Sequence, residues 1–327
     1  MLRSDPGKEN KGNCVDVSIV YVNWNSVDYI RESIRSVYEH ASGRLRCEII
    51  VVDNASPTGN VDALKDEFPE IALIKSAKNL GFAGANNLGY KSSAGENLLF
   101  LNPDTKLVNA AIDAMARNIR ALPDAGIIGC RLLNSDLSLQ TACVQTFPTI
   151  INQVLDNDYL RGRWPNSPLW GIRPLYADDG KPAKVEVVSG ACLMIKREAF
   201  EKASFFSEDY FMYAEDLDLC YKVVQAGYSN YYTGEGTVIH YGGKSSEPES
   251  ATMMKWRAIP RFCDKNRGRL YGAAFRMAMA CTAVVRLALL KTISLFGRGS
   301  AERTELNSAF AKWRTILNVL LTQTTPS

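Results

Sequence analysis

The chain has 327 residues, of which 46% are hydrophobic and 22% charged, and its mean hydropathy is −0.13. This length and composition are typical of a globular protein with a sizeable core, which excludes disordered, miniprotein and multispan membrane classes. The net charge of +3 hides an asymmetry. Residues 255–327 hold 13 basic and 3 acidic residues, so residues 1–254 carry a net negative charge, with 32 acidic and 25 basic residues. The basic tail predicts an anionic partner, either nucleic acid or a membrane surface.

The cysteines and the first residues indicate the compartment. The eight cysteines form no C-x-x-C pair, which argues against a zinc site or a disulfide framework. Residues 1–14 are a polar leader without the apolar stretch of a signal peptide, so we expect the chain to stay in the cytoplasm. Cys47, Cys130 and Cys192 stand in apolar runs and are expected to fill the core.

Apolar runs of strand length alternate with segments of helical period over the first hundred residues. Strands are expected at 15–24, 47–53, 71–76 and 97–102, helices at 28–41 and 61–68, and a Gly/Asn-rich loop at 79–93. Strand and helix in alternation predict parallel pairing with right-handed crossovers, hence a doubly wound α/β sheet.

Polar residues follow three of these strands directly. They are, in chain order, Asn23 and Asn25, Asp53 and Asn54, and Asn102 and Asp104. A single polar residue there is often a helix cap, but three groups at the edge where such sheets bind ligands indicate a site. In the intervening loop, Gly81, Gly84 and Gly89 would let the backbone approach a ligand closely.

Two common nucleotide-binding motifs are absent. The 79–93 segment is not G-x-G-x-x-G and lacks the acid that a dinucleotide site needs further on, which disfavours a nicotinamide dehydrogenase. The GGKSS segment at 242–246 resembles the end of a P-loop, but Val238 stands where the first glycine is required. A Walker-type NTPase is therefore excluded.

The second half predicts a mixed region. Residues 184–200 are expected to form a strand, a Ser-Gly turn, a second strand and a short helix, and 229–243 a strand that ends on His240. Glu215, Asp216 and Asp218 open a helix, where acids pair favourably with the positive helix end. Because Asp216 and Asp218 point to different sides, at least one acid is expected to face the cleft.

Seven segments together resemble a known family. In chain order they are VSIVYVNWN, VVDNAS, NLGFAGANNLG, FLNPD, SGACLMIKR, FMYAEDLDLC and VIHYGG. This set resembles glycosyltransferase family 2, and within it the rhamnosyltransferase-type enzymes that extend cell-surface polysaccharides, over about residues 15–270. The resemblance implies a GT-A fold and transfer, with inversion, from a nucleoside diphosphate sugar. It also suggests a catalytic domain over 15–254, with a nucleotide-binding half at about 15–133 and an acceptor half at about 134–254, followed by a helical extension over 255–327.

The resemblance also implies roles for single residues on the donor side. Asp53 matches the family acid that hydrogen-bonds the pyrimidine edge, and Asn23 and Asn25 line the same pocket. A loop against the nucleoside and sugar is matched by Asn79, Gly81 and Asn86.

The metal and the base follow from the same resemblance. The family's Asp-x-Asp is here Asn102-Pro103-Asp104, which leaves Asp104 to bind Mg²⁺ or Mn²⁺, with Asn102 near the ribose and His240 completing the shell. Asp216 matches the base that deprotonates the acceptor hydroxyl, with Glu215 as the alternative.

The basic tail predicts helices on a membrane surface. Cations recur every fourth position at Arg257, Arg261, Lys265 and Arg269, although Pro260 must start or kink this helix. Residues 270–296 are apolar but carry Arg276, Arg286 and Lys291 within an arc of roughly 140°. No uncharged run approaches the ~18 residues of a membrane span. We expect a helix in the bilayer interface with its basic arc toward anionic headgroups, or else docking on the catalytic domain or a second subunit.

The sequence therefore predicts an inverting, metal-dependent glycosyltransferase, peripheral on the inner face of the plasma membrane. By resemblance its donor is dTDP-rhamnose, with UDP-sugars left open, and its acceptor a lipid-linked or polysaccharide glycan. A sugar nucleotidyltransferase is one alternative, but it needs a basic, Gly-rich triphosphate loop where this chain has VNWNSVDY. A non-catalytic membrane-associated scaffold is the other, and the acids described above argue against it. The C-terminal helices could form a homo-oligomer, and no nucleic-acid partner is expected because no known motif accompanies the basic charge.

Overall fold

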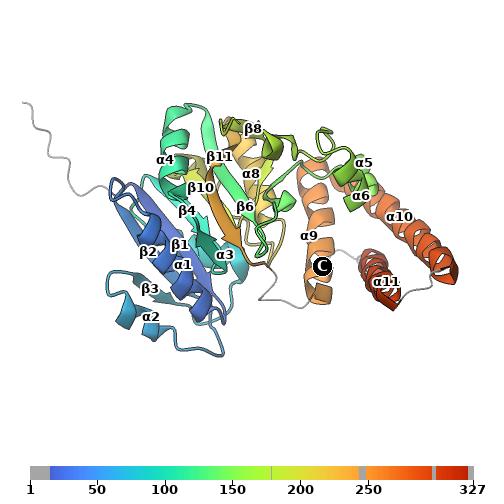
Figure 1. Cartoon of the computed structure of the whole chain (residues 1–327), viewed down its shortest axis with the longest axis horizontal. Helices are drawn as coiled ribbons and strands as arrows, with labels where there is room; N and C mark the ends of the chain where they lie inside the picture. Colours follow the sequence, from blue (N-terminus) through green and yellow to red (C-terminus); the bar gives the residue numbers. More distant parts are fainter. Residues whose placement is uncertain (1–14, 178, 243–247, 297–299, 323–327) are drawn as a thin grey trace, which may run out of the picture.

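The computed structural model describes residues 15–177, 179–242, 248–296 and 300–322 (Figure 1). The polar leader at 1–14 and most of the GGKSS segment lie outside the described residues. The strands are β1 (Val17–Asn23), β2 (Cys47–Asp53), β3 (Ala72–Lys75), β4 (Asn97–Leu101), β5 (Thr105–Leu107), β6 (Ala125–Leu133), β7 (Val144–Gln145), β8 (Ala183–Val185), β9 (Val187–Val188), β10 (Cys192–Lys196) and β11 (Ser229–His240). The helices are α1 (Val27–His40), α2 (Asp62–Glu67), α3 (Gly81–Lys91), α4 (Ala111–Ala121), α5 (Ile150–Leu155), α6 (Asp158–Arg163), α7 (Arg197–Lys202), α8 (Glu215–Gln225), α9 (Pro248–Arg267), α10 (Arg269–Phe296) and α11 (Ser300–Thr322), with 3₁₀ turns at Thr141–Cys143 and Arg173–Tyr176.

A nine-stranded sheet in the order β3-β2-β1-β4-β10-β6-β11-β5, with β8 paired to β11, forms the centre of the protein. The pairs β2–β3, β1–β2, β1–β4 and β6–β11 are parallel, whereas β10 runs antiparallel between β4 and β6. Alternate side chains along each strand feed two cores. One core includes residues of α1, α2 and α4, and the other residues of α3, α7 and α8. The predicted doubly wound, mostly parallel α/β sheet with a mixed second half is confirmed.

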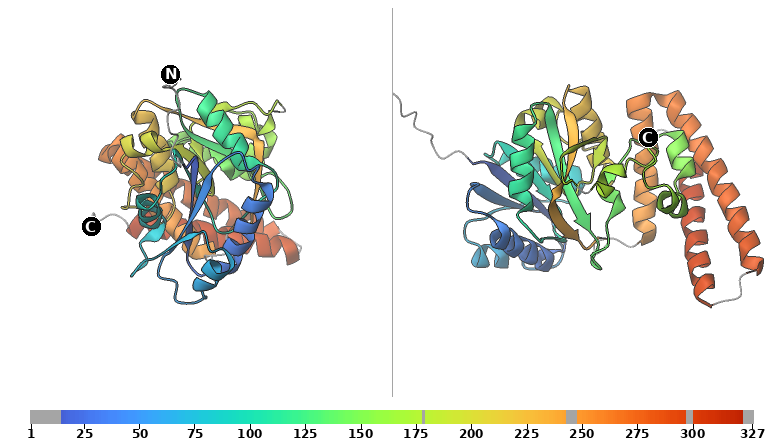
Figure 2. Two further views of the ribbon diagram at one scale, coloured as in Figure 1. Left: turned by 90° about the vertical axis from the view of Figure 1, so that its left-hand side faces the viewer. Right: turned by 45° about the horizontal axis from the view of Figure 1, so that its top comes forward.

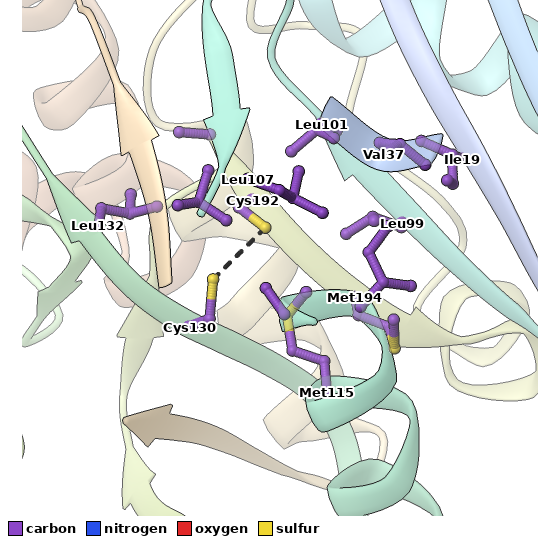
Figure 3. Packing of buried hydrophobic residues seen from close by; sticks show 14 of the residues in the cluster. Ile19, Val37, Leu99, Leu101, Leu107, Met115, Cys130, Leu132, Cys192 and Met194 are labelled. Atoms are coloured by element: carbon purple, nitrogen blue, oxygen red, sulfur yellow. Dashed lines mark hydrogen bonds between the residues drawn. The ribbon is translucent and has the colours of Figure 1, made fainter. Parts of the chain in front are cut away.

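The first core is close-packed around two cysteines (Figure 3). Cys130 on β6 and Cys192 on β10 are buried with their Sγ atoms 3.6 Å apart, and both are free thiols. Both therefore fill the core as expected. Cys47, in contrast, is exposed, because it starts β2 at the edge of the packed layer.

The Gly/Asn-rich segment is a helix and not the loop that we expected. α3 covers Gly81–Lys91 and packs on β1 and β2. A Cβ on Gly89 would lie 2.5 Å from Val20 Cγ1, so the glycine lets the helix approach the sheet closely. At Gly84 a Cβ would lie 3.0 Å from Leu80 Cβ. These two glycines serve packing within the protein, and only Gly81, with φ of 72°, keeps the conformational role of a glycine at a turn.

The C-terminal helices α9, α10 and α11 contact one another and lie to one side of the sheet (Figures 1 and 2). α9 is continuous through Pro260, so this proline neither starts the helix nor ends it. Phe262 of α9 is fully buried against two residues that precede the C-terminal helices. Its ring centroid lies 6.2 Å from that of Phe147 and 5.6 Å from that of Tyr221. The boundary that charge suggested after residue 254 falls inside this helix.

Two of the three cations of the expected basic arc do not face outward, whereas the third, Lys291, is exposed. Arg276 donates to Asp264 at 2.7 Å, and Arg286 donates to the carbonyl oxygens of Val154 and Asp156 at 2.9 and 2.8 Å. The last carbonyls of α5 have no partner within their own helix, so a guanidinium satisfies them. Seven large apolar side chains of α10 are exposed instead: Leu270, Met277, Val284, Val285, Leu289, Ile293 and Leu295.

Two of the cations that recur every fourth position on α9 also contact the rest of the protein, since Arg261 and Lys265 form ion pairs with Asp209. Within the described ranges, α10 is the one helix long and apolar enough to cross a membrane by length and composition. The exposed surface of α10 is therefore mainly apolar, and of the predicted arc Lys291 is exposed while Arg276 and Arg286 are not free to face a membrane.

Candidate active site

The first group of polar residues lies at the carboxyl ends of β1 and β2. The two strands pair with Asn23 opposite Asp53, and Asn23 Nδ2 donates to Asp53 Oδ1 at 2.7 Å. Both side chains are buried, and Asn23 Oδ1 accepts from the Ser26 amide at 3.0 Å. The parallel register thus brings the predicted acid and amide into direct contact.

Asn25 joins this group through a serine that the sequence analysis missed. Ser56 Oγ accepts from Asn23 Nδ2 at 3.1 Å and from the Asn25 amide at 3.0 Å. Asn25 has a left-handed backbone, with φ of 57°, and its Oδ1 accepts from the Thr58 amide at 3.1 Å. The two loops that follow β1 and β2 are tied together in this way.

The segment before α3 is held at the same edge of the sheet. Asn54 Nδ2 donates to Asn79 Oδ1 at 2.9 Å, and the Gly81 amide donates to the same oxygen at 2.9 Å. A Cβ on Gly81 would lie 2.4 Å from the Phe211 carbonyl oxygen, so this turn accepts only glycine. Asn86 lies one turn further along α3 and is buried, and its Nδ2 donates to the Phe82 carbonyl at 3.0 Å.

The second group lies where β4 ends and β5 pairs with β11. This pairing places His240 opposite Thr105, beside Asp104. His240 Nε2 lies 3.4 Å from Asp104 Oδ1 and 3.4 Å from Asn102 Nδ2. Gln140 Oε1 lies 2.9 Å from His240 Nδ1, and this contact assigns the ring proton to Nδ1. In the neutral ring, the Nε2 lone pair then faces Asp104.

The second group fits a divalent cation. A carboxylate, an imidazole nitrogen with an available lone pair and an amide oxygen are suitable ligands. Asn102 Oδ1 is buried and has no hydrogen-bond partner among the described residues, which is consistent with an atom that binds a ligand. The part of the chain that the structure describes holds no set of three His, Cys, Asp or Glu side chains around one point. An ion bound here would therefore keep positions for oxygens that the protein does not supply.

The third group opens α8. Tyr213 and Ala214 are both left-handed, with φ of 70° and 64°, and turn the chain into the helix. Glu215 is only 6% exposed, and its Oε2 has no partner within the described part of the chain. Burial raises the pKa of Glu215 well above its ordinary value, and the neighbouring charge of Asp216 raises it further.

Asp216 is held differently. Its Oδ2 accepts from the Gly190 amide at 2.9 Å, its Oδ1 accepts from the Leu217 amide at 2.8 Å, and the side chain keeps partial exposure. Burial raises the pKa of Asp216, while the two amide hydrogen bonds oppose that shift. Asp216, and not Glu215, is thus the oriented carboxylate with access to solvent.

Gly190 and Ala191 connect the second and third groups. The Gly190 amide donates to Asp216, and the Ala191 carbonyl accepts from the Asn102 amide at 3.0 Å. A Cβ on Gly190 would lie 3.1 Å from Asp216 Cβ, so the close approach needs a glycine. The SGA segment contained this signal, whereas no local pattern could have pointed to Gln140.

Asp218 has a structural role and, contrary to Asp216, is not exposed to solvent. Its side chain is completely buried and accepts hydrogen bonds from Ser207 at 2.5 Å, Lys265 at 3.0 Å and Asn266 at 3.0 Å. Burial opposes its ionisation, but these hydrogen bonds outweigh burial and lower the pKa of Asp218. The carboxylate thereby fastens α8 to the end of α9.

Because the Glu215 carboxyl is buried and its Oε2 has no hydrogen-bond partner among the described residues, we predict that its ionisation lowers the free energy of unfolding. The pKa of Glu215 is raised from 4.5 in the folded chain, so above about pH 4.5 the unfolded chain binds fewer protons and stability falls as pH rises. Between the two pKa values this cost grows by about 1.4 kcal/mol per pH unit. Glu215→Gln removes the titrating proton, and urea unfolding should show a larger gain in stability at pH 8 than at pH 5.

Glu39→Gln is the matched control, because Glu39 is exposed. It should show no such gain at either pH. An equal effect of Glu215→Gln at pH 5 and pH 8 would contradict a protonated, buried Glu215.

Comparisons with known proteins agree with this geometry. The model of the family described as "Glycosyl transferase family 2" matches residues 18–203, more than half of the chain. The chain is 28% identical over 217 residues to the N-acetylglucosaminyl-diphospho-decaprenol L-rhamnosyltransferase of Mycobacterium tuberculosis, covering 63% of this chain and 70% of that protein. It is 23% identical over 256 residues to the rhamnosyltransferase WbbL of Escherichia coli, covering 75% of this chain and 91% of WbbL.

A solved structure shares the fold. The mannosyltransferase PcManGT from Pyrobaculum calidifontis, in complex with GDP-Man and Mn²⁺, superposes with a TM-score of 0.62 at 18% identity. The similarity covers 95% of this chain and 88% of that protein. The predicted GT-A fold is confirmed, including its C-terminal helical extension beyond the sheet.

Proposed function

The chain belongs to glycosyl transferase family 2 and is a glycosyltransferase, and from this premise we propose that it moves a sugar, with inversion, from a nucleoside diphosphate sugar to a hydroxyl of a lipid-linked or polysaccharide acceptor in cell-surface glycan synthesis. The similarity to two proteins named rhamnosyltransferases supports L-rhamnose from dTDP-rhamnose as the donor, with UDP-sugars as the alternative. Family membership favours this reaction over nucleotidyl transfer and over a non-catalytic scaffold.

One observation carries the proposal. The Gly190 amide donates to Asp216, and the carbonyl of the next residue, Ala191, accepts from the Asn102 amide. An oriented carboxylate therefore lies close to the group that fits a cation. Inverting transfer needs this combination: a base for the incoming hydroxyl and a site for the departing diphosphate.

The first group would hold the nucleoside. The hydrogen bond from Asn23 fixes Asp53 through Oδ1, so the carboxylate can accept from a pyrimidine N–H through its other oxygen. Asn25, Asn79, Gly81 and Asn86 are proposed to shape the donor pocket around it. Because Asn79 and Asn86 already bond to protein groups, their contribution would be mainly to position the backbone of this segment.

The second group would hold the cation. Asp104 and His240, with the Asn102 amide oxygen once its side chain is turned, are suitable protein ligands. When bound, Mg²⁺ or Mn²⁺ supplies positive charge for the diphosphate oxygens of the leaving group. The nitrogen ligand favours Mn²⁺ slightly over Mg²⁺. Gln140 would keep His240 in the tautomer that can bind an ion.

The third group would move the proton. Asp216 Oδ2 takes the proton of the acceptor hydroxyl as that oxygen attacks the donor sugar, and the Gly190 amide holds the carboxylate in place. The raised pKa of Asp216 makes it a stronger base than an exposed carboxylate. The pKa of Glu215 is raised by burial, which favours its neutral form and so disfavours a second negative charge beside Asp216.

We place the enzyme on the inner face of the plasma membrane, attached through the region after residue 254. The outward apolar face of α10 supports this attachment by burial of side chains at the bilayer surface. The exposed cations of the tail would add attraction to anionic lipids. A second copy of the chain covering the same face is the alternative.

A donor panel tests the proposed function. We expect the purified full chain, given a lipid-linked acceptor and Mn²⁺, to release nucleoside diphosphate fastest from dTDP-rhamnose. Each reaction has an Asp216→Asn blank, which should release none above background. Release of pyrophosphate from a nucleoside triphosphate and a sugar phosphate would instead identify a nucleotidyltransferase, and no turnover with any donor would contradict the proposal.

A further inference from the structure

A cavity outside the three groups has no role in the reaction as derived so far. It has a volume of about 550 Å³ and lies between the end of α5, α6 and the segment that follows α6. Its walls are mainly apolar and include Leu155, Leu160, Trp164, Leu169 and Trp170. Volumes of this size are typical of sites for small organic ligands.

Apolar side chains surround the opening of this cavity. Leu155 is 40% exposed and Trp164 54% exposed, although both line the cavity. Two neighbours on α5 and α6, Ile151 and Tyr159, are 63% and 75% exposed. Exposed apolar groups gathered at a cavity mark a surface that a partner covers.

The cavity adjoins the outward apolar face of α10. α5 contacts α10, and Arg286 of α10 donates to the carbonyls of Val154 and Asp156 that end α5. The Ile150 amide also donates to the Tyr271 hydroxyl at 3.2 Å. Figure 2 shows these short helices beside the C-terminal helices. An apolar ligand in the cavity would therefore lie next to the face proposed to meet the bilayer.

The chain also connects the cavity with the proposed base. β7, which precedes α5, pairs with β9, and the Ser189 amide donates to the Cys143 carbonyl at 3.0 Å just before the Gly190 contact to Asp216. Lys255 of α9 interacts electrostatically with both Asp216 and Asp156, the residue that joins α5 to α6. Asp216 and the carboxylate at the end of α5 are thus both within charge range of one cation.

Two cations are available to an anionic linkage, one on the cavity wall and one with favourable charge interactions with Asp216 and Asp156. Arg163 lines the cavity, is exposed, and stacks on Trp164 at 5.8 Å from the ring centroid. Lys255 is exposed, attracted by the two carboxylates and repelled by Arg161. A molecule with a hydrocarbon chain, a phosphate linkage and a sugar has a matching partner for each part: apolar walls, cations and a base.

We propose that this cavity binds the hydrocarbon chain of a lipid-linked acceptor, with the phosphate linkage at Arg163 and Lys255 and the acceptor hydroxyl at Asp216. The proposal rests on the proposed function, because it assumes that the acceptor is lipid-linked. It adds a binding site for the lipid itself, formed by the segment 155–170. The cavity then determines which acceptors are used, and the first two groups determine the donor.

Calorimetry with farnesyl diphosphate as the probe tests the site without turnover. We expect the full chain to bind this probe, and Leu155→Asp and Trp164→Asp to weaken binding about tenfold or more by placing a charge in an apolar wall. Leu137→Asp is the matched control, since Leu137 is 62% exposed in a turn outside the cavity lining, and it should change nothing. Unaltered melting temperatures would show that the variants fold.

Three outcomes would overturn the proposal. The first is equal affinity for the probe in both cavity variants and the control. The second is affinity for inorganic diphosphate as high as for farnesyl diphosphate, because the chain would then contribute nothing. The third is loss of binding to vesicles of anionic phospholipid in the cavity variants with intact binding of the probe, which would make the segment a bilayer contact only.

Kinetics separate this proposal from the proposed function. In the cavity variants, KM for a long-chain acceptor should rise with kcat unchanged, and KM for a chain-free acceptor should stay the same. If wild type turns over no donor but the variants still lose the probe, the lipid site stands and the assigned reaction fails. If turnover is normal and KM for the long-chain acceptor is unaffected in the variants, the reaction stands and the lipid site fails.

Discussion

Asp216→Asn should lower kcat by about 10² to 10⁴-fold while leaving the affinity for the nucleoside diphosphate nearly unchanged. The amide keeps the shape of the side chain, and its one oxygen can still accept a hydrogen bond from the Gly190 amide, although its NH2 group then replaces the oxygen that accepts from the Leu217 amide. It has lost the ability to take a proton from the acceptor hydroxyl. The measurement is single-turnover transfer alongside calorimetric binding of the nucleotide in the presence of Mn²⁺.

Glu215→Gln is the comparison that separates the two acids. Burial raises the pKa of Glu215 well above its ordinary value and so favours the neutral form that an amide resembles, and Glu215→Gln should therefore retain most of the activity of the wild type. Near-normal turnover of Asp216→Asn would reject the assignment of the base. A larger loss in Glu215→Gln than in Asp216→Asn would exchange the two roles.

Asp104→Ala should weaken nucleoside diphosphate binding at least tenfold in Mn²⁺ and make it insensitive to chelator. In the wild type, chelation is expected to lower affinity, because the cation shields the diphosphate from the carboxylates of the site. The variant loses the one carboxylate that lies against His240 Nε2. Titration of nucleotide with Mn²⁺ and then with chelator measures both effects.

Gln140→Leu provides an intermediate case. It leaves Asp104 and His240 in the chain but removes the acceptor for His240 Nδ1–H, and loss of such an outer contact typically costs 10 to 100-fold in metal affinity. Its defect should be rescued by excess Mn²⁺, unlike that of Asp104→Ala. Equal nucleotide affinity of wild type with and without chelator would rule out the metal role altogether.

The sheet and the donor edge could be predicted from the sequence because both depend on local pattern. Buried strands with polar residues directly after them, such as Asn23 and Asp53, meet at one edge whenever the strands are parallel. Contacts between loops that are far apart in the sequence could not be predicted, because no pattern of neighbouring residues indicates them. Gln140, which orients His240 across one hundred positions of sequence, is the clearest example.

Two predictions failed because composition was given priority over packing. Gly84 and Gly89 suggested a loop, yet glycine in α3 allows the helix to approach β1 and β2, a tertiary gain that outweighs the cost of glycine in a helix. On α10, the basic arc was expected to face outward. The periodicity located the arc correctly, but it could not show that the carbonyls ending α5 would bind Arg286.

The hydrogen bonds that α9 donates to Asp218 of α8 determine where the chain can be truncated. Asp218 lies in the first turn of α8, two residues after Asp216, and it depends on Lys265 and Asn266 near the end of α9. A fragment ending at residue 254, where the charge changes sign, would remove Lys265 and Asn266 from this buried carboxylate and leave it the more distant Lys222, 3.9 Å away, so we expect the fragment to be less stable than the full chain. The shortest piece that keeps this carboxylate satisfied ends after Asn266, so a stretch of sequence with the charge of a tail belongs, in folding terms, to the catalytic body.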